Sequence, residues 1–232
     1  MFFYDSLYIL LVLPAVIFSM IASAMVKSTF NKYSKFRSHR GITGADAARR
    51  VLDANGLYHV GIQRVSGNLT DHYDPRANVI RLSDATYDNT SPAAIGVAAH
   101  EAGHAVQHAV GYMPIHIRAA IIPITNIGAK LTMPLVLLGI LLSYYGSIFI
   151  YLAYAGVICF SLSTLFQLVT LPTEFNASRR ALAAIEQYGL LDREELGQTK
   201  KVLTAAAMTY VAALAVSLMQ LLRLVLLVQR RR

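Results

Sequence analysis

Three long stretches without a charged residue constrain what this chain can fold into. Residues 6–26, 131–170 and 202–222 contain no Asp, Glu, Lys or Arg. Because a helix of roughly 20 apolar residues crosses a bilayer, the first and last stretches each fit one crossing. The middle stretch is long enough for two crossings, joined by a tight turn near residues 143–146. The sequence therefore predicts four transmembrane helices.

The first apolar stretch can be interpreted in two ways. A cleaved signal peptide would explain the small residues at 22–24, but it would need a positively charged segment before the apolar run. Here the basic residues come afterwards, between Lys27 and Arg40. We therefore expect residues 1–26 to be an uncleaved N-terminal anchor.

The polar residues lie in two blocks, 27–118 and 171–201, which together are sufficient for one small core. Residues 43–56 have the caps of a helix, since Thr43 precedes the run and Gly56 follows it. Residues 58–64 and 79–82 read as strands of a small antiparallel ribbon. A second helix is predicted between Ser91 and Gly111. The expected fold class is a mainly α membrane protein with a small α+β, zincin-like catalytic region.

The second predicted helix carries the motif His100-Glu101-Ala102-Gly103-His104. Side chains four residues apart share one face of a helix, so His100 and His104 can bind the same zinc ion. Glu101 is placed to act as a general base on a water that the metal activates. The motif predicts one Zn²⁺ per chain. The single cysteine, Cys159, offers neither a disulfide framework nor a thiolate zinc site.

A catalytic zinc needs a third protein ligand. His108 lies too far along the same helix to reach the ion together with His100. No spacing rule selects or excludes His72 and His116. Glu174 is the preferred candidate, because it opens a helix predicted to start after residues 172–173, and a membrane hairpin returns it to the side of His104.

The segments HEAGHAVQH and EFNASRRA, with the anchor and the apolar hairpin, resemble the neutral zinc metallopeptidases of bacterial membranes, the YugP-like proteins. The layout is more remotely similar to the HtpX-like and CAAX prenyl proteases. The resemblance implies His100 and His104 as ligands, Glu101 as the base and Glu174 as the third ligand. Ser178 stands where the remote relatives place an aspartate that orients a ligand histidine.

Stabilisation of the oxyanion needs a further group, for which Tyr210, Arg179 and His72 are candidates. A packing or interfacial role is the alternative for Tyr210. Residues 79–82 could bind substrate by strand addition, or they could form a plain core strand.

These features predict an N-terminal anchor (1–26), a catalytic region (27–118), an amphipathic segment with a transmembrane hairpin (119–170), a third-ligand region (171–201) and a C-terminal helix with a basic tail (202–232). Lys and Arg outnumber Asp and Glu in the catalytic region. The positive-inside rule therefore places the active site on the cytoplasmic side of the cell membrane. The arginines at 230–232 oppose this orientation, since four crossings put both termini on the other side.

The predicted function is a multi-pass membrane zinc endopeptidase that acts on peptides or membrane proteins. The bilayer is its expected partner, the oligomeric state stays open, and no aromatic-interleaved basic platform predicts nucleic-acid binding. The alternatives are a zinc-binding scaffold or sensor without protease activity, and a zinc hydrolase of a non-peptide substrate. A transporter is disfavoured, because the hairpin lacks intramembrane ionisable groups.

Overall fold

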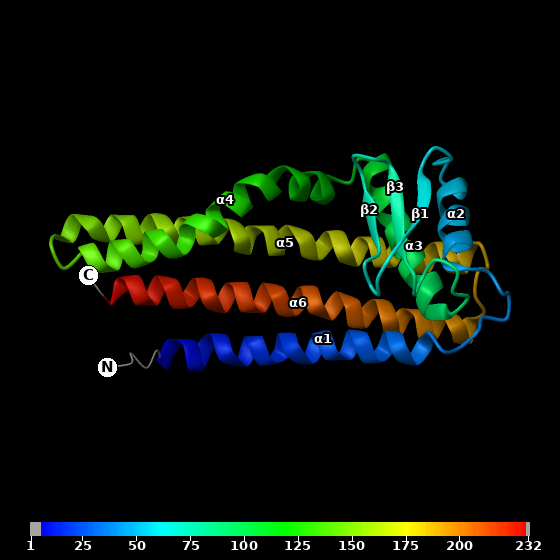
Figure 1. The fold of residues 1–232 in the computed structure, drawn as a ribbon, viewed down its shortest axis with the longest axis horizontal. Coiled ribbons are helices and arrows are strands. Elements are labelled where there is room, and N and C mark those ends of the chain that lie inside the picture. The colour runs from blue at the N-terminus through cyan, green and yellow to red at the C-terminus, as the bar shows by residue number, and fades with distance from the viewer. Residues whose placement is uncertain (1–5, 231–232) are drawn as a thin grey trace. The chain divides into compact units, whose positions relative to one another are not determined.

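The computed structural model describes residues 6–230, so Arg231 and Arg232 of the predicted basic tail lie outside the described residues. The chain is mainly α-helical, with one small sheet (Figure 1). In order, its elements are the π-helix η1 (Tyr8–Val12), α1 (Leu13–Tyr33), α2 (Gly44–Ala54), β1 (Gly61–Val65), β2 (His72–Asp74), β3 (Val79–Ser83), α3 (Pro92–Ala109), α4 (Met113–Leu142), the 3-10 helix η2 (Ser147–Phe149), α5 (Ile150–Gln187) and α6 (Arg193–Gln229).

Four helices in the described part of the chain are long and apolar enough to cross a membrane, as the sequence predicts. They begin at Tyr8, Met113, Ser147 and Arg193, and the turn between the second and third lies at residues 143–146. All four continue beyond the charge-free stretches, which is why the sequence alone underestimates their lengths.

The prediction of a separate helix starting after residues 172–173 is wrong. Pro172 lies inside α5, which runs without a break to Gln187. A proline in a helix interior removes one backbone hydrogen bond and usually kinks or ends the helix. In apolar surroundings, however, ending the helix would expose several unpaired backbone groups instead of one. Continuation of α5 is the less costly solution.

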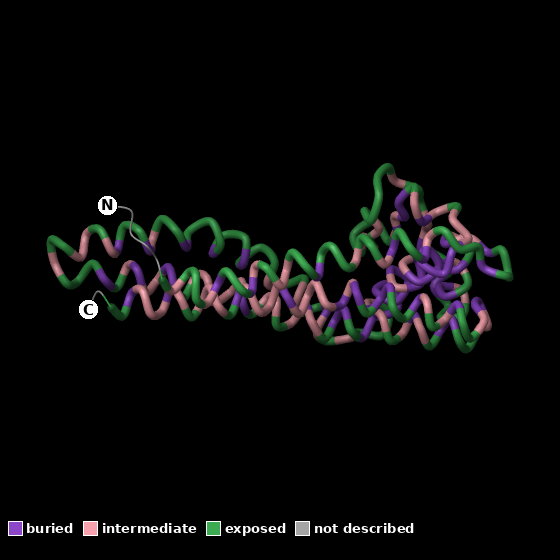
Figure 2. Tube along the Cα trace, turned by 90° about the horizontal axis from the view of Figure 1, so that it is seen from below, coloured by how far each residue is buried: buried purple, intermediate pink, exposed green. Residues whose placement is uncertain are grey.

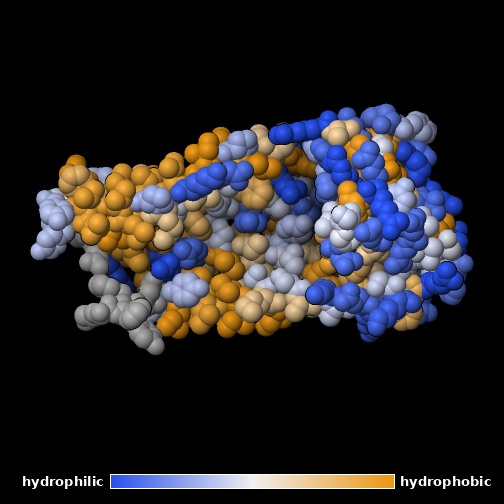
Figure 3. Space-filling view, in the orientation of Figure 1, coloured by the Kyte–Doolittle hydropathy of each residue, from blue (hydrophilic) through white to orange (hydrophobic). Residues whose placement is uncertain are grey.

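Contacts divide the chain into two compact units. Among the described residues, a helical unit comprises 6–22, 117–171 and 209–230, and a mixed unit comprises 23–116 and 172–208. Four helices have residues in both units: α1, α4, α5 and α6. Buried residues gather mainly in the mixed unit (Figure 2). On the face in Figure 3, hydrophobic side chains predominate over the helical unit and hydrophilic ones predominate over the mixed unit.

In the helical unit, small residues let α4 and α5 approach closely. A Cβ added to Gly139 would clash with the backbone nitrogen of Ala153, and one added to Gly156 would lie 2.9 Å from the carbonyl oxygen of Thr132. Such contacts between small residues are a usual means of helix association in membranes, where the hydrophobic effect does not drive helices together. Val136 and Val157 belong to the buried cluster of this unit.

The sheet of the mixed unit has the strand order β1-β3-β2. β2 pairs with β3 antiparallel, but β1 pairs with β3 parallel, with Ile62 opposite Ile80. The predicted antiparallel ribbon is therefore wrong in its pairing. β3 lies in the centre of the sheet, with Ile80 and Leu82 fully buried. Strand addition at residues 79–82 is thus excluded, because both edges of β3 are occupied.

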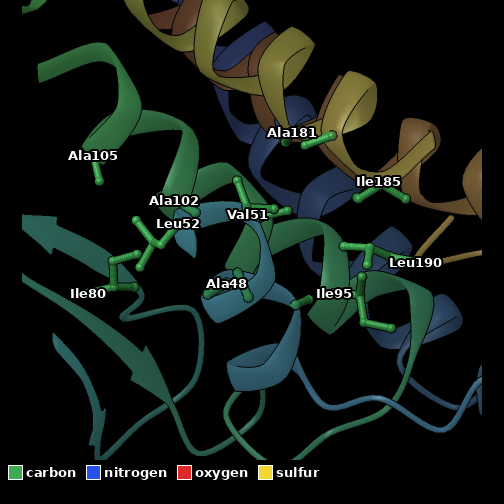
Figure 4. Packing of buried hydrophobic residues seen from close by; sticks show 14 of the residues in the cluster. Ala48, Val51, Leu52, Ile80, Ile95, Ala102, Ala105, Ala181, Ile185 and Leu190 are labelled. Carbon is green, nitrogen blue, oxygen red and sulfur yellow. The ribbon is translucent and has the colours of Figure 1, made fainter. Parts of the chain in front are cut away.

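The core of the mixed unit joins five elements, α2, β3, α3, α5 and α6. Figure 4 shows Leu52 of α2, Ile80 of β3, Ala102 of α3 and Ile185 of α5 packed into one cluster. The two predicted helix starts are confirmed: Thr43 forms a capping box with Asp46, and the Ser91 hydroxyl accepts a hydrogen bond at the start of α3. This core fixes α3 against α5.

Candidate metal centre

Two helices of the mixed unit bring the candidate ligands together. α3 carries His100 and His104, and α5 carries Glu174. The helices meet where a Cβ on Gly103 would lie 2.8 Å from the carbonyl oxygen of Ala177. Only glycine fits such an approach without displacing the backbone. The glycine inside the motif therefore serves the packing that places the ligands.

The donor atoms have the spacing that zinc requires. The Oε2 atom of Glu174 lies 3.3 Å from Nε2 of His100 and 3.5 Å from Nε2 of His104. One ligand atom from each residue lies within 4.8 Å of the others. Two ligands held about 2.0–2.1 Å from a tetrahedral zinc are themselves about 3.4 Å apart. Two imidazoles and one carboxylate with this spacing fit a catalytic zinc site with one open position.

Each imidazole has a partner on its other ring nitrogen. Nδ1 of His104 is 2.9 Å from Oε1 of Gln107, and Nδ1 of His100 is 3.1 Å from Oγ of Ser178. When Nδ1 carries the proton it donates to these oxygens, and Nε2 is left with a lone pair for a metal. The predicted position of Ser178 beside a ligand histidine thus has a geometric basis, although its role stays a prediction.

The sequence did not predict Gln107 as a partner of His104, nor the residues that hold its side chain in place. Its Nε2 donates to the carbonyl oxygen of Thr173, at 2.8 Å, and to Oδ1 of Asn176, at 3.0 Å. Arg180 donates to the same Asn176 oxygen, at 2.8 Å. The signal for Gln107 was its position three residues after His104, on the same face of the helix. Nothing in the local sequence marks Asn176, because its contact joins residues far apart in the chain.

The carboxylates at this centre are shielded from solvent. Glu174 is 2% exposed and Glu101 is 9% exposed. Burial lowers the pKa of His104, but the hydrogen bond to Glu174 and the charge of Glu101 outweigh it, so the pKa is raised overall. A buried carboxylate is stable only beside a positive or hydrogen-bonding group. The site is therefore built to hold positive charge.

The edge strand β2 positions Glu101. The backbone N–H of Tyr73 donates to Oε2 of Glu101 at 3.0 Å. Because this N–H is bonded to Glu101 and not to Ile80, which stands opposite Tyr73, it lies on the side of β2 that faces away from β3. Glu101 therefore lies beside both the candidate metal ligands and the outer edge of β2.

The other residues singled out from the sequence lie outside the ligand group. The exposed His72 has Nδ1 2.8 Å from the carbonyl oxygen of Thr70. The rings of His108 and His116 contact each other, with centroids 5.3 Å apart. Arg179 is exposed, and Tyr210 belongs to the helical unit. Their roles in stabilising the oxyanion stay predictions.

A second group of acids and histidine has a structural explanation. Nδ1 of His39 lies 2.6 Å from Asp192, and its backbone N–H donates to Glu195. Asp192 and Glu195 also bond reciprocally to each other's backbone, as a capping box at the start of α6. The group therefore anchors the chain before α2 to α6, and helix capping accounts for its geometry.

Comparison with known proteins gives the family of the chain. The sequence model of a family described as "Putative neutral zinc metallopeptidase" matches residues 8–229. The "Putative membrane protease YugP" of Bacillus subtilis (strain 168) is 47% identical to the chain over 221 residues, which cover 95% of this chain and 96% of that protein. No solved structure matches the chain.

Proposed function

The chain belongs to the family of putative neutral zinc metallopeptidases, and we propose that it is a membrane-bound zinc endopeptidase. The observation that carries the proposal is the convergence of His100, His104 and Glu174 within 4.8 Å, next to Glu101. In this proposal the first three residues hold the ion and Glu101 is the general base. This ligand set is of the gluzincin type.

A zinc ion bound there would lower the pKa of a water toward about 7 and polarise the scissile carbonyl. Glu101 would accept a proton from the attacking water and donate it to the amine nitrogen that leaves. Its hydrogen bond from the Tyr73 N–H keeps the carboxylate beside the ligands. Ser178 and Gln107 would hold the two imidazoles in the tautomer that leaves Nε2 free.

The substrate peptide is proposed to lie along β2. This is a terminal strand of the sheet; its outward N–H at residue 73 donates to Glu101, so the peptide would pair with the remaining backbone groups on this edge. An extended peptide that pairs with a free strand edge gains backbone hydrogen bonds and presents alternate side chains to the protein. Such pairing would bring a scissile bond alongside the base.

The test compares three forms of the full-length protein in detergent: unchanged, Glu101→Gln and Glu174→Ala. Bound zinc is measured by elemental analysis, and hydrolysis is measured on an unfolded protein. We expect Glu101→Gln to keep its zinc and to lose hydrolysis by at least about 100-fold. Glu174→Ala should lose most of its zinc.

Two outcomes would contradict the proposal. Equal hydrolysis by the unchanged protein and Glu101→Gln would exclude the base role, and full zinc retention by Glu174→Ala would exclude the third ligand. A zinc-loaded protein that cleaves no peptide substrate would favour the two alternatives, a zinc-binding scaffold or sensor without protease activity, or a zinc hydrolase of a non-peptide substrate.

A further inference from the structure

A groove of about 510 Å³ lies between α1 and α6 within the mixed unit. Its walls change character along both helices. Lys32 of α1 and Lys200 and Lys201 of α6 line one part, whereas Met25 and Ala205 line the rest. A site with a cationic end and an apolar end fits an amphiphile of opposite charge.

The lysines are brought together without acidic partners. Within residues 6–230, no ion pair joins Lys32, Lys200 or Lys201 to a carboxylate. The ammonium groups of Lys32 and Lys201 lie 5.4 and 5.9 Å from the centre of the same ring, that of Tyr33. A ring face attracts a cation, but two cations on one ring also repel each other. An anion in the groove would remove that repulsion.

The lysines occupy the level at which a headgroup would be expected. The charge-free stretch 6–26 ends directly before Lys27, and the stretch 202–222 begins directly after Lys201. Both helices therefore change from apolar to basic at the groove. Basic residues at the ends of membrane helices lie beside lipid phosphates, and basic pockets between such helices bind anionic headgroups.

We propose that this groove is a binding site for one anionic phospholipid. Lys32, Lys200 and Lys201 would contact the phosphate, and the acyl chains would follow the apolar wall at Met25 and Ala205. Charge complementarity selects this occupant, because a zwitterionic lipid brings its own ammonium group into a site that already holds three. The apolar wall distinguishes the lipid from a free phosphate, which has no group to place there. The proposal does not depend on peptide hydrolysis.

The test uses the full-length protein in a mild non-ionic detergent. The measurements are the thermal midpoint and the number of bound lipids by native mass spectrometry, with added phosphatidylglycerol, phosphatidylcholine, glycerol 1-phosphate or inorganic phosphate. The variant is Lys32→Gln with Lys201→Gln. Lys200 is kept because it also lines a smaller cavity beside Ser178. The matched control, Arg50→Gln with Arg76→Gln, removes two exposed basic groups elsewhere in the mixed unit.

We expect phosphatidylglycerol to bind the unchanged protein and the control, and to bind the lysine variant at least about tenfold more weakly. A second variant, Thr29→Phe, fills the groove and keeps every lysine, and it should weaken binding to a similar degree. If the double lysine variant fails to fold, phosphatidylglycerol binding by Thr29→Phe is sufficient to test the proposal. Unchanged phosphatidylglycerol binding in these variants would overturn the proposal. So would equal binding of phosphatidylcholine, or an equal effect of either water-soluble phosphate.

Discussion

Each motif histidine presents one ring nitrogen to Glu174 and the other to a neutral side chain. The neutral partners, Ser178 and Gln107, are 3.1 and 2.9 Å away. A neutral acceptor fixes the ring without adding negative charge to a site that already contains two buried carboxylates. A serine at residue 178 is therefore electrostatically compatible with the predicted role of orienting His100.

The first prediction concerns these neutral acceptors. Replacement of Ser178 by Ala, or of Gln107 by Leu, removes the acceptor for one imidazole N–H. Because second-layer partners typically contribute 10- to 100-fold to metal affinity, we expect zinc affinity to fall by about that factor in each variant. Competition with a chromogenic chelator measures it. The control is Thr70→Ala, which touches neither imidazole, and unchanged zinc affinity in Ser178→Ala would show that Ser178 does not orient His100.

At the scale of elements, the close approach of α3 to α5 controls the ligand geometry. The contact rests on Gly103, whose added Cβ would be 2.8 Å from the Ala177 carbonyl oxygen. Ala177 is fully buried, so the oxygen cannot move into solvent. Separation of the helices is the only relief, and it would draw Glu174 away from the two histidines.

Substitution of Gly103 by Ala tests this argument. Overpacking of this kind destabilises a protein by about 1–3 kcal/mol, so the thermal midpoint should fall together with the zinc affinity. The matched control is Gly197→Ala in α6, where an added Cβ meets nothing within 4 Å. There the better helix propensity of alanine should leave the midpoint unchanged or slightly raised. Equal behaviour of the two variants would show that the helix contact does not limit the site.

The contact between His39 and the start of α6 predicts a pH dependence. The hydrogen bond to Asp192 and the charge of Glu195 raise the pKa of His39. The folded protein therefore binds this proton more tightly than the unfolded chain does. The resulting stabilisation is fully present below the unfolded pKa of about 6.5, and it is lost as the pH rises through the raised folded pKa.

His39→Gln should accordingly lower the thermal midpoint at pH 6 and have less effect at pH 9. The change should be small, about 1–2 °C, because the His39 side chain is 81% exposed. Thermal unfolding at both pH values, with His59→Gln as the control, measures it. A midpoint difference that grows toward pH 9 would contradict the assigned direction.

The sequence was sufficient for some elements because their causes are local. The caps at Thr43 and Ser91, and the charge-free runs, predict helices from neighbouring residues alone. The parallel pairing of β1 with β3 and the passage of α5 through Pro172 depend on distant packing. The same division holds for the site. The motif is local, whereas the contacts of Asn176 and Tyr73 join segments that only the fold brings together.

At the scale of the whole molecule, the distribution of charge around the apolar stretches predicts which side of the membrane the site faces. Basic residues follow the first apolar stretch and precede the last one. These flanks have the composition of cytoplasmic segments, while the turn at 143–146 carries no charge. With four crossings, we expect the mixed unit in the cytoplasm and this turn outside. An anionic lipid bound in the proposed groove would favour the same orientation, because the cytoplasmic leaflet carries anionic headgroups that attract basic residues.

Cysteine labelling in intact cells tests the orientation. Cys159 is the single cysteine, so Cys159→Ser gives a background without thiols. Ser66→Cys replaces an exposed residue in the loop between β1 and β2, and Tyr144→Cys replaces a residue that is 90% exposed at the turn. A membrane-impermeant maleimide should label residue 144 in intact cells, and residue 66 only after the membrane is opened. The reverse pattern would mean that the arginines at 230–232 decide the orientation, and not the basic residues that follow the first apolar stretch and precede the last one. The substrates would then be extracellular, because the proposed base and ligands lie in the same unit as residue 66.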